Sequence, residues 1–250
     1  MSRTVLITGV AGGIGSATAQ VFAEAGWRVI GVDRGDRPAP TSLHRFIRAD
    51  IADIEQSRAI FDEVTAQEGR LDALVNNAAI QVAKPLVETT PEEWDAVMAS
   101  NLRSVYLGVR HAYPLLRADG GGAIVNVSSV HAVATSANIA AYAASKGALL
   151  ALTRALAIEL AREQIRVNAV LPGAVDTPML HAGLTRGHVE GANIEELMDA
   201  LAARTVMGRI GKPTEIGRAI LFLADSHYSS FVTGQALIVD GGATARLSTE

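Results

Sequence analysis

Short apolar segments alternate with longer amphipathic segments along most of the chain. The short segments are typical of buried β-strands, because they are rich in Val, Ile, Leu and Ala and are bounded by turn residues. The predicted strands are Thr4–Ile7, Arg28–Val32, Arg45–Ile47, Leu71–Val75, Ala123–Val127, Arg166–Val170 and Ala236–Val239. Strand–helix alternation of this kind predicts right-handed βαβ crossovers. We therefore predict an α/β fold with a doubly wound, mostly parallel seven-stranded sheet and helices on both faces.

Turn residues separate these elements without dividing the chain. Gly26 ends the first predicted helix, Ser16–Ala25, and Pro91 opens another. No linker rich in Pro and Ser interrupts the alternation, so residues 1–250 are predicted to form a single domain. The stretch from Leu171 to Arg204 carries Gly183, Gly187 and Gly191 and has no strand pattern. Such a segment is typical of a lid or binding loop, and we predict a substrate lid at about residues 171–204.

Composition removes several kinds of chemistry from consideration. The 250 residues include no Cys, which excludes disulfides, thiolate nucleophiles and Cys-bound metals. The six His residues show no helical spacing with one another or with acids, so we predict no metal site. The net charge of −4, with dispersed Arg residues, gives no support for nucleic acid as a partner. Without a signal-peptide core or a long apolar run, we expect a cytoplasmic protein with no membrane partner.

The first predicted strand leads into a glycine-rich turn that precedes a helix. Gly9, Gly13, Ile14 and Gly15 lie in this turn, with the spacing G-x-x-x-G-x-G rather than the general G-x-G-x-x-G. Small residues let the backbone approach a pyrophosphate, and the amino end of a helix favours its negative charge. The turn therefore predicts dinucleotide binding, and a tight turn without a ligand is the alternative interpretation.

Acidic residue Asp33 ends the second predicted strand, where the adenosine ribose of a dinucleotide is expected. Its carboxylate can accept hydrogen bonds from the ribose hydroxyls and would repel a 2′-phosphate. Gly12 offers such a phosphate no basic side chain, so NAD is favoured over NADP. Arg34 and Arg37 could instead reach a phosphate, or could simply be solvated loop charges.

A second acid, Asp50, ends the third predicted strand and precedes Ile51. Its carboxylate could accept a hydrogen bond from the adenine amino group. Alternatively, it could cap the helix that begins near Asp53.

Tyr142 and Lys146 are four residues apart and share one face of a predicted helix. Ser129 closes the strand before that helix, at the sheet edge where open α/β folds bind ligands. Hydride transfer at a C–O carbon requires proton transfer at the oxygen, and a free tyrosine, with a pKa of about 10, is almost entirely protonated at neutral pH. A nearby lysine and an oxidised nicotinamide would both favour the phenolate. For the pair alone, the alternative is a half-buried aromatic with a lysine extending past it to solvent.

These motifs occur in order along the chain, together with Asn76-Asn77-Ala78-Ala79, Asn101 and Pro172-Gly173. In this combination the sequence resembles the short-chain dehydrogenase/reductase family, from Thr4 to about Gly242. The resemblance implies a Rossmann fold and an NAD(P)-dependent oxidoreductase that acts on CH–OH groups. One departure is Ala79, where the family usually has Gly.

The resemblance also implies roles for individual residues. Tyr142 would be the general acid/base, Lys146 would lower its pKa and hold the nicotinamide ribose, and Ser129 would orient the substrate oxygen. Asn101 would hold a water that links Lys146 to solvent, and Thr177 would meet the nicotinamide amide. The full set expected to bind the cofactor is Gly9, Gly13, Ile14, Gly15, Asp33, Arg34, Asp50, Ile51, Asn77, Ala78, Tyr142, Lys146, Pro172, Gly173, Val175 and Thr177.

Substrate contacts are expected from Gln81, Ser129, His131, Tyr142 and Ala174. Gln81 and His131 are similar to the carboxylate-holding residues of 3-hydroxybutyrate dehydrogenases in the same family. Elsewhere that similarity weakens, because this sequence has Ile139 for a Lys, Ala174 for a Trp and Gly183 for a second Gln. Without the cation, a carboxylate would be poorly matched. We therefore favour an uncharged substrate.

These features together predict hydride transfer between NAD(H) and a small secondary alcohol, polyol or ketone. The alternatives are an NADPH-dependent 3-oxoacyl thioester reductase, a 3-hydroxybutyrate-type hydroxy acid dehydrogenase and a regulator that senses nucleotides without catalysis. Asp240-Gly241-Gly242 resembles a family turn at a subunit interface and implies a homo-oligomer, a homotetramer, although a turn that merely closes the last strand is equally supported. The helical stripe of leucines is expected to form core or subunit packing; it comprises Leu149, Leu150, Leu152, Leu156 and Leu160.

Overall fold

The computed structural model describes residues 2–35, 42–184, 191 and 193–245. Seven strands form one sheet in the order β3-β2-β1-β4-β5-β6-β7, and every neighbouring pair is parallel. The strands are β1 (Thr4–Thr8), β2 (Arg28–Asp33), β3 (Arg45–Arg48), β4 (Ala73–Asn76), β5 (Gly122–Val127), β6 (Ile165–Pro172) and β7 (Ala236–Val239). The predicted doubly wound sheet is confirmed, and it is parallel throughout.

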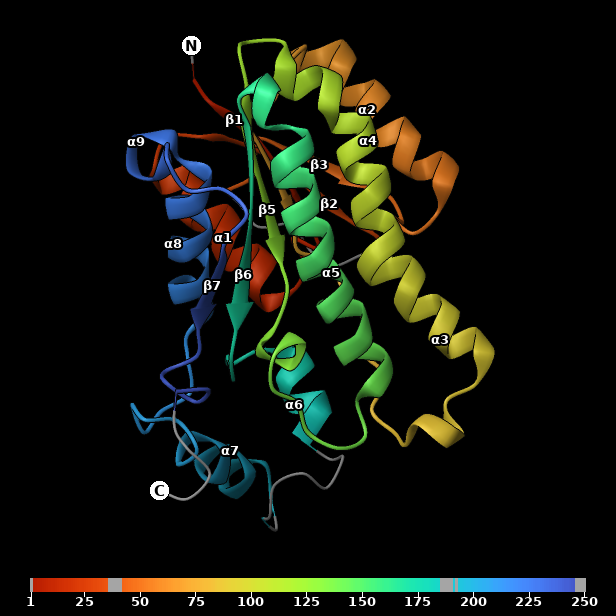
Figure 1. The fold of residues 1–250 in the computed structure, drawn as a ribbon, viewed down its shortest axis with the longest axis vertical. Helices are drawn as coiled ribbons and strands as arrows, with labels where there is room; N and C mark the ends of the chain where they lie inside the picture. The colour runs from red at the N-terminus through yellow and green to blue at the C-terminus, as the bar shows by residue number, and fades with distance from the viewer. Residues whose placement is uncertain (1, 36–41, 185–190, 192, 246–250) are drawn as a thin grey trace.

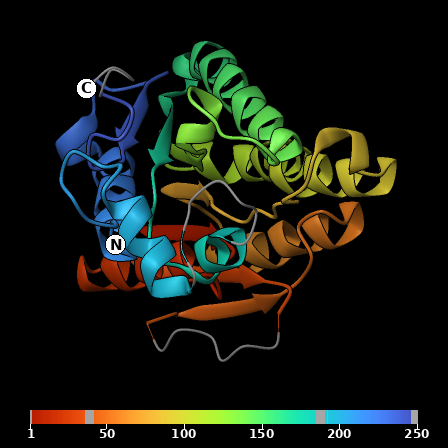
Figure 2. The same ribbon diagram turned by 90° about the horizontal axis from the view of Figure 1, so that it is seen from below.

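Helices cover both faces of this sheet (Figures 1 and 2). The α-helices are α1 (Gly13–Glu24), α2 (Ile54–Glu68), α3 (Pro91–Met98), α4 (Ser104–Arg117), α5 (Ala140–Glu159), α6 (Pro178–Leu184), α7 (Ile194–Ala202), α8 (Pro213–Ala224) and α9 (Ser226–Ser229). Helices α1 and α8 pack together on one face, and α2, α4 and α5 lie on the other. Helices α6 and α7 lie beyond the ends of the strands, at the bottom of Figure 1.

Two apolar layers result from the alternation of side chains along each strand. Leu6 and Ile124 point to the face covered by α2, α4 and α5, whereas Val5 and Val125 point to the face covered by α1 and α8. These strand side chains are completely or almost completely buried. The small aliphatic composition of the chain therefore fills both layers with few aromatic rings.

The strand order reverses between β1 and β4. From β1 the chain crosses to β2 and β3, and it then returns to pair β4 with the other side of β1. The crossovers leave in opposite directions here, so the carboxyl ends of β1 and β4 border a crevice, the usual ligand position in open α/β sheets. Both the glycine-rich turn and the segment Asn76–Ala79 begin at this crevice.

Several element boundaries differ from the sequence-based expectation. Helix α1 begins at Gly13 rather than Ser16, because Gly12 adopts an extended conformation and serves as its N-cap. Strand β4 begins at Ala73 rather than Leu71, because the Leu71 amide donates to the carbonyl of Leu115. Residues 171–204 include the end of β6 and helices α6 and α7, whereas residues 185–190 and 192 lie outside the described residues.

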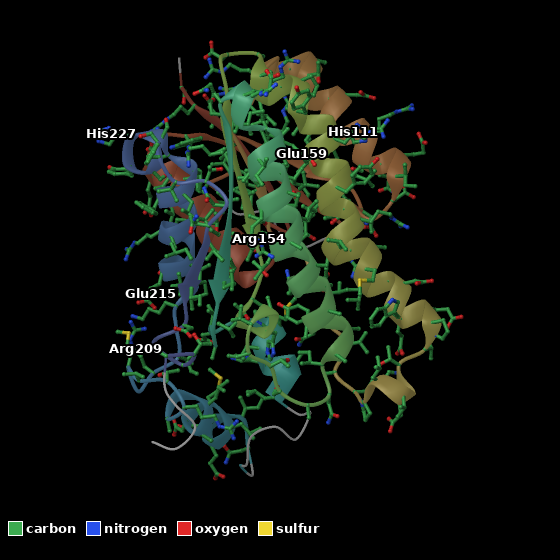
Figure 3. All side chains as sticks on the ribbon, viewed as in Figure 1. His111, Arg154, Glu159, Arg209, Glu215 and His227 are labelled. Atoms are coloured by element: carbon green, nitrogen blue, oxygen red, sulfur yellow. The ribbon has the colours of Figure 1, made fainter. Side chains whose placement is uncertain are left out.

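The start of this predicted lid is fastened to the chain segment that follows the lid. Val175 and Gly211 form an isolated parallel bridge, with the Gly211 amide donating to Ala174 O at 2.9 Å and the Asp176 amide donating to Gly211 O at 2.9 Å. Just beyond, Arg209 and Glu215 form an ion pair at 2.7 Å beside the start of α8 (Figure 3). Hydrogen bonding from Arg209 lowers the pKa of Glu215 to about 2. The bridge and the ion pair tie the segment that follows the lid, around Arg209 and Gly211, to the start of the lid and to α8.

Two other sequence-based expectations concern packing. Leu149 is buried in the main core and Leu150 in a smaller cluster, while Leu152, Leu156 and Leu160 pack partly buried against the main core. The interpretation of this stripe as helix core is confirmed. The Asp240 carboxylate accepts hydrogen bonds from Gly242 N and Thr244 N, both at 2.8 Å, so this turn is stabilised internally. A subunit interface at this turn stays a prediction.

None of the helices formed by the described residues is both long and apolar enough to cross a membrane. Within the same residues, the His, Asp and Glu side chains form no cluster suited to holding a metal ion.

Candidate active site

A cavity of about 320 Å³ lies at the carboxyl edge of the sheet and extends from the end of β2 to helix α6. It brings together the predicted cofactor-binding residues and most of the predicted catalytic and substrate-binding residues. Asn101 and Ala174 are the exceptions, because they are not among the residues that line it. Sequence reasoning missed part of the wall, which also includes Val32, Ala79, Ile80, Ser100, Val127, Ser128, Pro178, Met179, Leu180 and Gly183.

The glycine-rich turn forms a close cradle at the β1 end of the cavity. A Cβ on Gly15 would lie only 2.0 Å from Gly9 O, and one on Gly13 would lie 2.7 Å from Thr177 Cγ2. Gly9 has a φ of +73°, which favours glycine. The turn is also braced by Asn77, whose Nδ2 donates to Thr8 O at 2.9 Å and to Gly9 O at 3.1 Å. Backbone packed this tightly before the amino end of α1 fits the pyrophosphate of a nicotinamide dinucleotide.

Asp33 lies where the adenosine half of such a cofactor would be bound. Its two carboxylate oxygens accept hydrogen bonds from Ala11 N and Gly35 N, each at 2.9 Å. Opposite it, Arg34 Nη1 lies 3.8 Å from Asp50 Oδ2, with the Arg34 side chain largely exposed. Among the described residues, the partners of the Asp33 carboxylate are therefore backbone amides. Arg37 lies outside the described residues.

The proposed capping role of Asp50 is wrong. Helix α2 is capped by Asp53, whose carboxylate accepts from Gln56 N at 2.8 Å. Asp50 instead accepts from Ala52 N at 2.9 Å in the turn before the helix, and it lines the cavity beside Ile51. Asp50 lies only three positions before the true N-cap, Asp53, and sequence pattern alone does not distinguish two acids so close together.

Helix α5 carries Tyr142 and Lys146 to the other end of the cavity. Both side chains are almost fully buried, as is Ser129, which follows β5. Lys146 Nζ donates to Val127 O at 2.7 Å and lies 5.5 Å from the centre of the Tyr142 ring. Ser129 Oγ accepts from His131 N at 3.2 Å, at the start of a short 3₁₀ turn. The structure thus places a phenol, an ammonium and a hydroxyl around one part of the cavity wall.

Burial changes the acid–base behaviour of Lys146. Removal of the ammonium from water lowers the pKa of Lys146 from 10.5 to about 7. An anion formed beside this side chain would favour its charged state again, because opposite charges stabilise each other more strongly in a poorly hydrated site. Lys146 can therefore respond to ionisation of its neighbour.

Helix α6 lines the end of the cavity where the substrate is expected to bind. Gln81 Nε2 donates to Met179 O at 2.8 Å, which joins the segment after β4 to α6. Gly183 packs against the same amide, since a Cβ there would lie 3.0 Å from Gln81 Nε2. His131 lies edge-on to Tyr142, with 6.0 Å between ring centres, and its Nδ1 is 2.9 Å from Thr135 Oγ1. Gln81 therefore helps to hold α6 over the cavity as well as lining it.

Asn101 and Ala174 lie behind the wall rather than in it. Asn101 belongs to the π-helical segment Ala99–Arg103, and its amide hydrogen bonds reach Ile80 and Ser145. The Ala174 carbonyl accepts from Gly211 N in the bridge described above. Contact between Ala174 and the substrate stays a prediction, since Ala174 lies between Gly173 and Val175, which both line the cavity. A water held by Asn101 stays a prediction.

Comparison with known proteins identifies close relatives over the full described fold. A family model described as enoyl-(acyl carrier protein) reductase matches residues 9–244. Cis-4-hydroxycyclohexanecarboxylate dehydrogenase of Sinomonas cyclohexanicum is 40% identical, and cyclopentanol dehydrogenase of Comamonas sp. (strain NCIMB 9872) is 38% identical; each alignment covers 97% of both chains. The ligand-free aldohexose dehydrogenase of Thermoplasma acidophilum superimposes with a TM-score of 0.92 at 32% identity, covering 99% of this chain and 96% of the other.

Substitution of Gly15 by Ala tests the glycine cradle. The added Cβ would meet Gly9 O at 2.0 Å and Asn77 Nδ2 at 2.7 Å, so the backbone has to shift. Overpacking of this kind costs about 1–3 kcal/mol, and we expect NADH affinity, measured by fluorescence titration, to fall about tenfold or more. Gly12→Ala is the matched comparison, because its Cβ would lie 3.3 Å from Gly9 O and should cost less. Equal affinities for both variants would contradict the cradle.

The lowered pKa of Lys146 predicts a pH dependence of stability without cofactor. Between pH 7 and pH 10.5 the unfolded chain binds more protons at this side chain than the folded protein. The free energy of unfolding should therefore rise with pH in that interval, by up to about 1.4 kcal/mol per pH unit from this group. Below pH 7, where Lys146 is charged in both states, burial of the charge costs the folded protein most. Lys146→Met should remove this slope in urea titrations at pH 7, 8 and 9. If the free energy of unfolding changed with pH equally in the wild type and in Lys146→Met, Lys146 would not be the source of the pH dependence.

Proposed function

The chain belongs to the short-chain dehydrogenase/reductase family, and we propose that it transfers a hydride between NAD(H) and a small secondary alcohol, polyol or ketone. Membership makes it an NAD(P)-dependent oxidoreductase that acts on CH–OH groups. One observation carries the finer proposal: buried Tyr142, Lys146 and Ser129 border the same cavity as the glycine cradle and Asp33. Proton-transfer and dinucleotide-binding groups are thus placed within one site.

The roles of the side chains follow from their chemistry. When bound, a nicotinamide cofactor would supply the hydride-accepting or hydride-donating carbon. During oxidation, the Tyr142 phenolate takes the proton from the substrate hydroxyl, and during reduction the Tyr142 hydroxyl returns it. The Lys146 ammonium stabilises the phenolate, and the Ser129 hydroxyl can hydrogen-bond the substrate oxygen. Burial of all three side chains keeps bulk water away from the proton being transferred.

Asp33 supports NAD as the cofactor. Both of its oxygens are fixed by Ala11 N and Gly35 N, so the carboxylate would have to move away from two hydrogen bonds to admit a 2′-phosphate. Among the described residues, Arg34 is the counter-charge near Asp33, and its Nη1 lies 3.8 Å from Asp50 Oδ2. Repulsion between the fixed Asp33 carboxylate and a 2′-phosphate is therefore expected to outweigh the attraction of that phosphate to Arg34.

The wall beneath α6 supports a small secondary alcohol with an apolar body. Ile80, Met179 and Leu180 line it together with the polar Gln81 and His131. Two relatives are named for their action on cyclopentanol and on cis-4-hydroxycyclohexanecarboxylate, both of which are cyclic secondary alcohols. We therefore propose ring alcohols of this size and the corresponding ketones as the first substrates to test. A homotetramer and a cytoplasmic location remain predictions from the sequence.

A reductase of acyl carrier protein thioesters is the second candidate, favoured by the description of the matching family model. A 3-hydroxybutyrate-type activity has less support, because Ile139 is buried and provides no cation for a carboxylate. A nucleotide sensor without catalysis would have no need for buried Tyr142 and Lys146 side chains that line the same cavity as Ser129.

Tyr142→Phe tests the proposed acid/base. The substitution removes only the hydroxyl, so NADH binding should persist while turnover falls by at least about 10²-fold, the usual contribution of acid–base catalysis. NADH absorbance at saturating alcohol measures turnover, and fluorescence titration measures binding. Activity near that of the wild type would contradict the role of Tyr142.

The relative affinity for NADH and NADPH tests the proposal that Asp33 favours NAD. We expect the wild-type protein to bind NADH at least about tenfold more tightly than NADPH, equivalent to about 1.4 kcal/mol. Asp33→Asn retains one acceptor oxygen but removes the charge, so it should narrow this difference mainly by improving NADPH affinity. Tighter binding of NADPH by the wild-type protein would overturn the preference and favour the thioester reductase.

A further inference from the structure

Ser145 lies between Tyr142 and Lys146 on helix α5 but is not among the residues that line the cavity. Its side chain is completely buried, and the residues flanking it are mostly alanines. A polar group in such a place is stable only when it is hydrogen-bonded, so its partners indicate what it does.

The hydroxyl of Ser145 connects two parts of the site. Ser145 Oγ donates to the main-chain oxygen of Tyr142 at 2.7 Å and accepts from Asn101 Nδ2 at 3.0 Å. The amide of Asn101 in turn accepts from Ile80 N and donates to Ile80 O, both at 2.9 Å. Because Ile80 lines the cavity, this chain of hydrogen bonds runs from the cavity wall to the backbone of Tyr142.

The position of Asn101 adds a second observation. Asn101 is almost fully buried and lies in the π-helical segment Ala99–Arg103, between α3 and α4. Such segments within helices occur frequently at functional sites. Here the segment presents one amide to both Ile80 and Ser145, so a single side chain links the loop after β4 to α5.

We propose that Ser145 is a positioning residue, which sets the location of Tyr142 relative to the cavity wall through Asn101 and Ile80. The proposal rests on the proposed role of Tyr142 as the acid/base. Ser145 does not touch the reacting atoms; it acts on the backbone that carries the phenol. Small displacements of a reacting group matter greatly, because a shift of about 1 Å can lower a rate about 10²-fold.

Helix α5 contains a matched control for the effect of losing a buried hydroxyl. Thr153 is also almost fully buried, and its Oγ1 donates to Leu149 O at 2.8 Å and accepts from Asn126 Nδ2 at 3.0 Å. Both hydroxyls therefore donate to a helix carbonyl and accept from a buried asparagine. Thr153 lies farther along the helix, and its partners do not line the cavity.

The experiment compares Ser145→Ala with Thr153→Val, each of which removes a hydroxyl with little change in volume. Both variants should melt at lower temperature than the wild type. Ser145→Ala should lower kcat roughly 10- to 10²-fold and move the midpoint of the pH profile of kcat, while NADH affinity changes less than about twofold. Thr153→Val should leave kcat and its pH profile unchanged. If Ser145→Ala does not fold, Ser145→Cys, which keeps a weaker donor of similar size, takes its place.

Unchanged kcat and pH profile in the Ser145 variant would overturn the proposal, as would an equal loss of kcat in Thr153→Val. The second result would show that any buried hydroxyl on α5 has this effect through stability alone. Activity of Tyr142→Phe near the wild-type level would identify a different failure, that of the proposed acid/base. The two failures are therefore distinguishable in one set of assays.

Discussion

Attachment of helix α5 to strand β5 is the constraint on which the geometry of the site depends. Ser128 Oγ donates to Lys146 O at 3.0 Å, and Lys146 Nζ donates to Val127 O at 2.7 Å. All these groups are buried, so sliding the helix would leave several polar atoms without partners and away from water. The phenol is thereby held at the carboxyl edge of the sheet.

The lid and helix α6, which cover the site, are held differently from helix α5, which carries the phenol. Helix α6 is joined to the segment after β4 by Gln81 and Met179, and the start of the lid is joined to the chain that follows the lid by the bridge between Val175 and Gly211. Among the described residues, these are few contacts compared with those that fix α5, and local stability follows the density of buried contacts. A helix α5 fixed by buried hydrogen bonds and a more loosely attached lid suit an enzyme that must admit and release two ligands.

The fold and much of the site could be predicted from sequence because they depend on local patterns. Runs of Val and Ile specify the strands, and Gly9, Asp33 and Tyr142 follow them at fixed places in the alternation. The exact start of α1 and the cap at Asp53 could not be predicted, since each depends on backbone conformation. The role of Ser145 was hidden for another reason: its partner Asn101 is distant in sequence, and a serine among alanines has no distinguishing pattern. Tertiary hydrogen bonds of this kind are visible only once the helices are packed.

The central claim is that this site moves a hydride between the carbinol carbon of a secondary alcohol and the nicotinamide. Transfer of deuterium tests it most directly. Cyclic secondary alcohols, beginning with cyclopentanol deuterated at the carbinol carbon, are incubated with the protein and NAD⁺, and the NADH formed is examined by NMR. The account predicts deuterium at C4 of the nicotinamide ring and release of the matching ketone. Absence of NADH across a broad panel of alcohols, polyols and hydroxy acids, despite firm NADH binding, would contradict it.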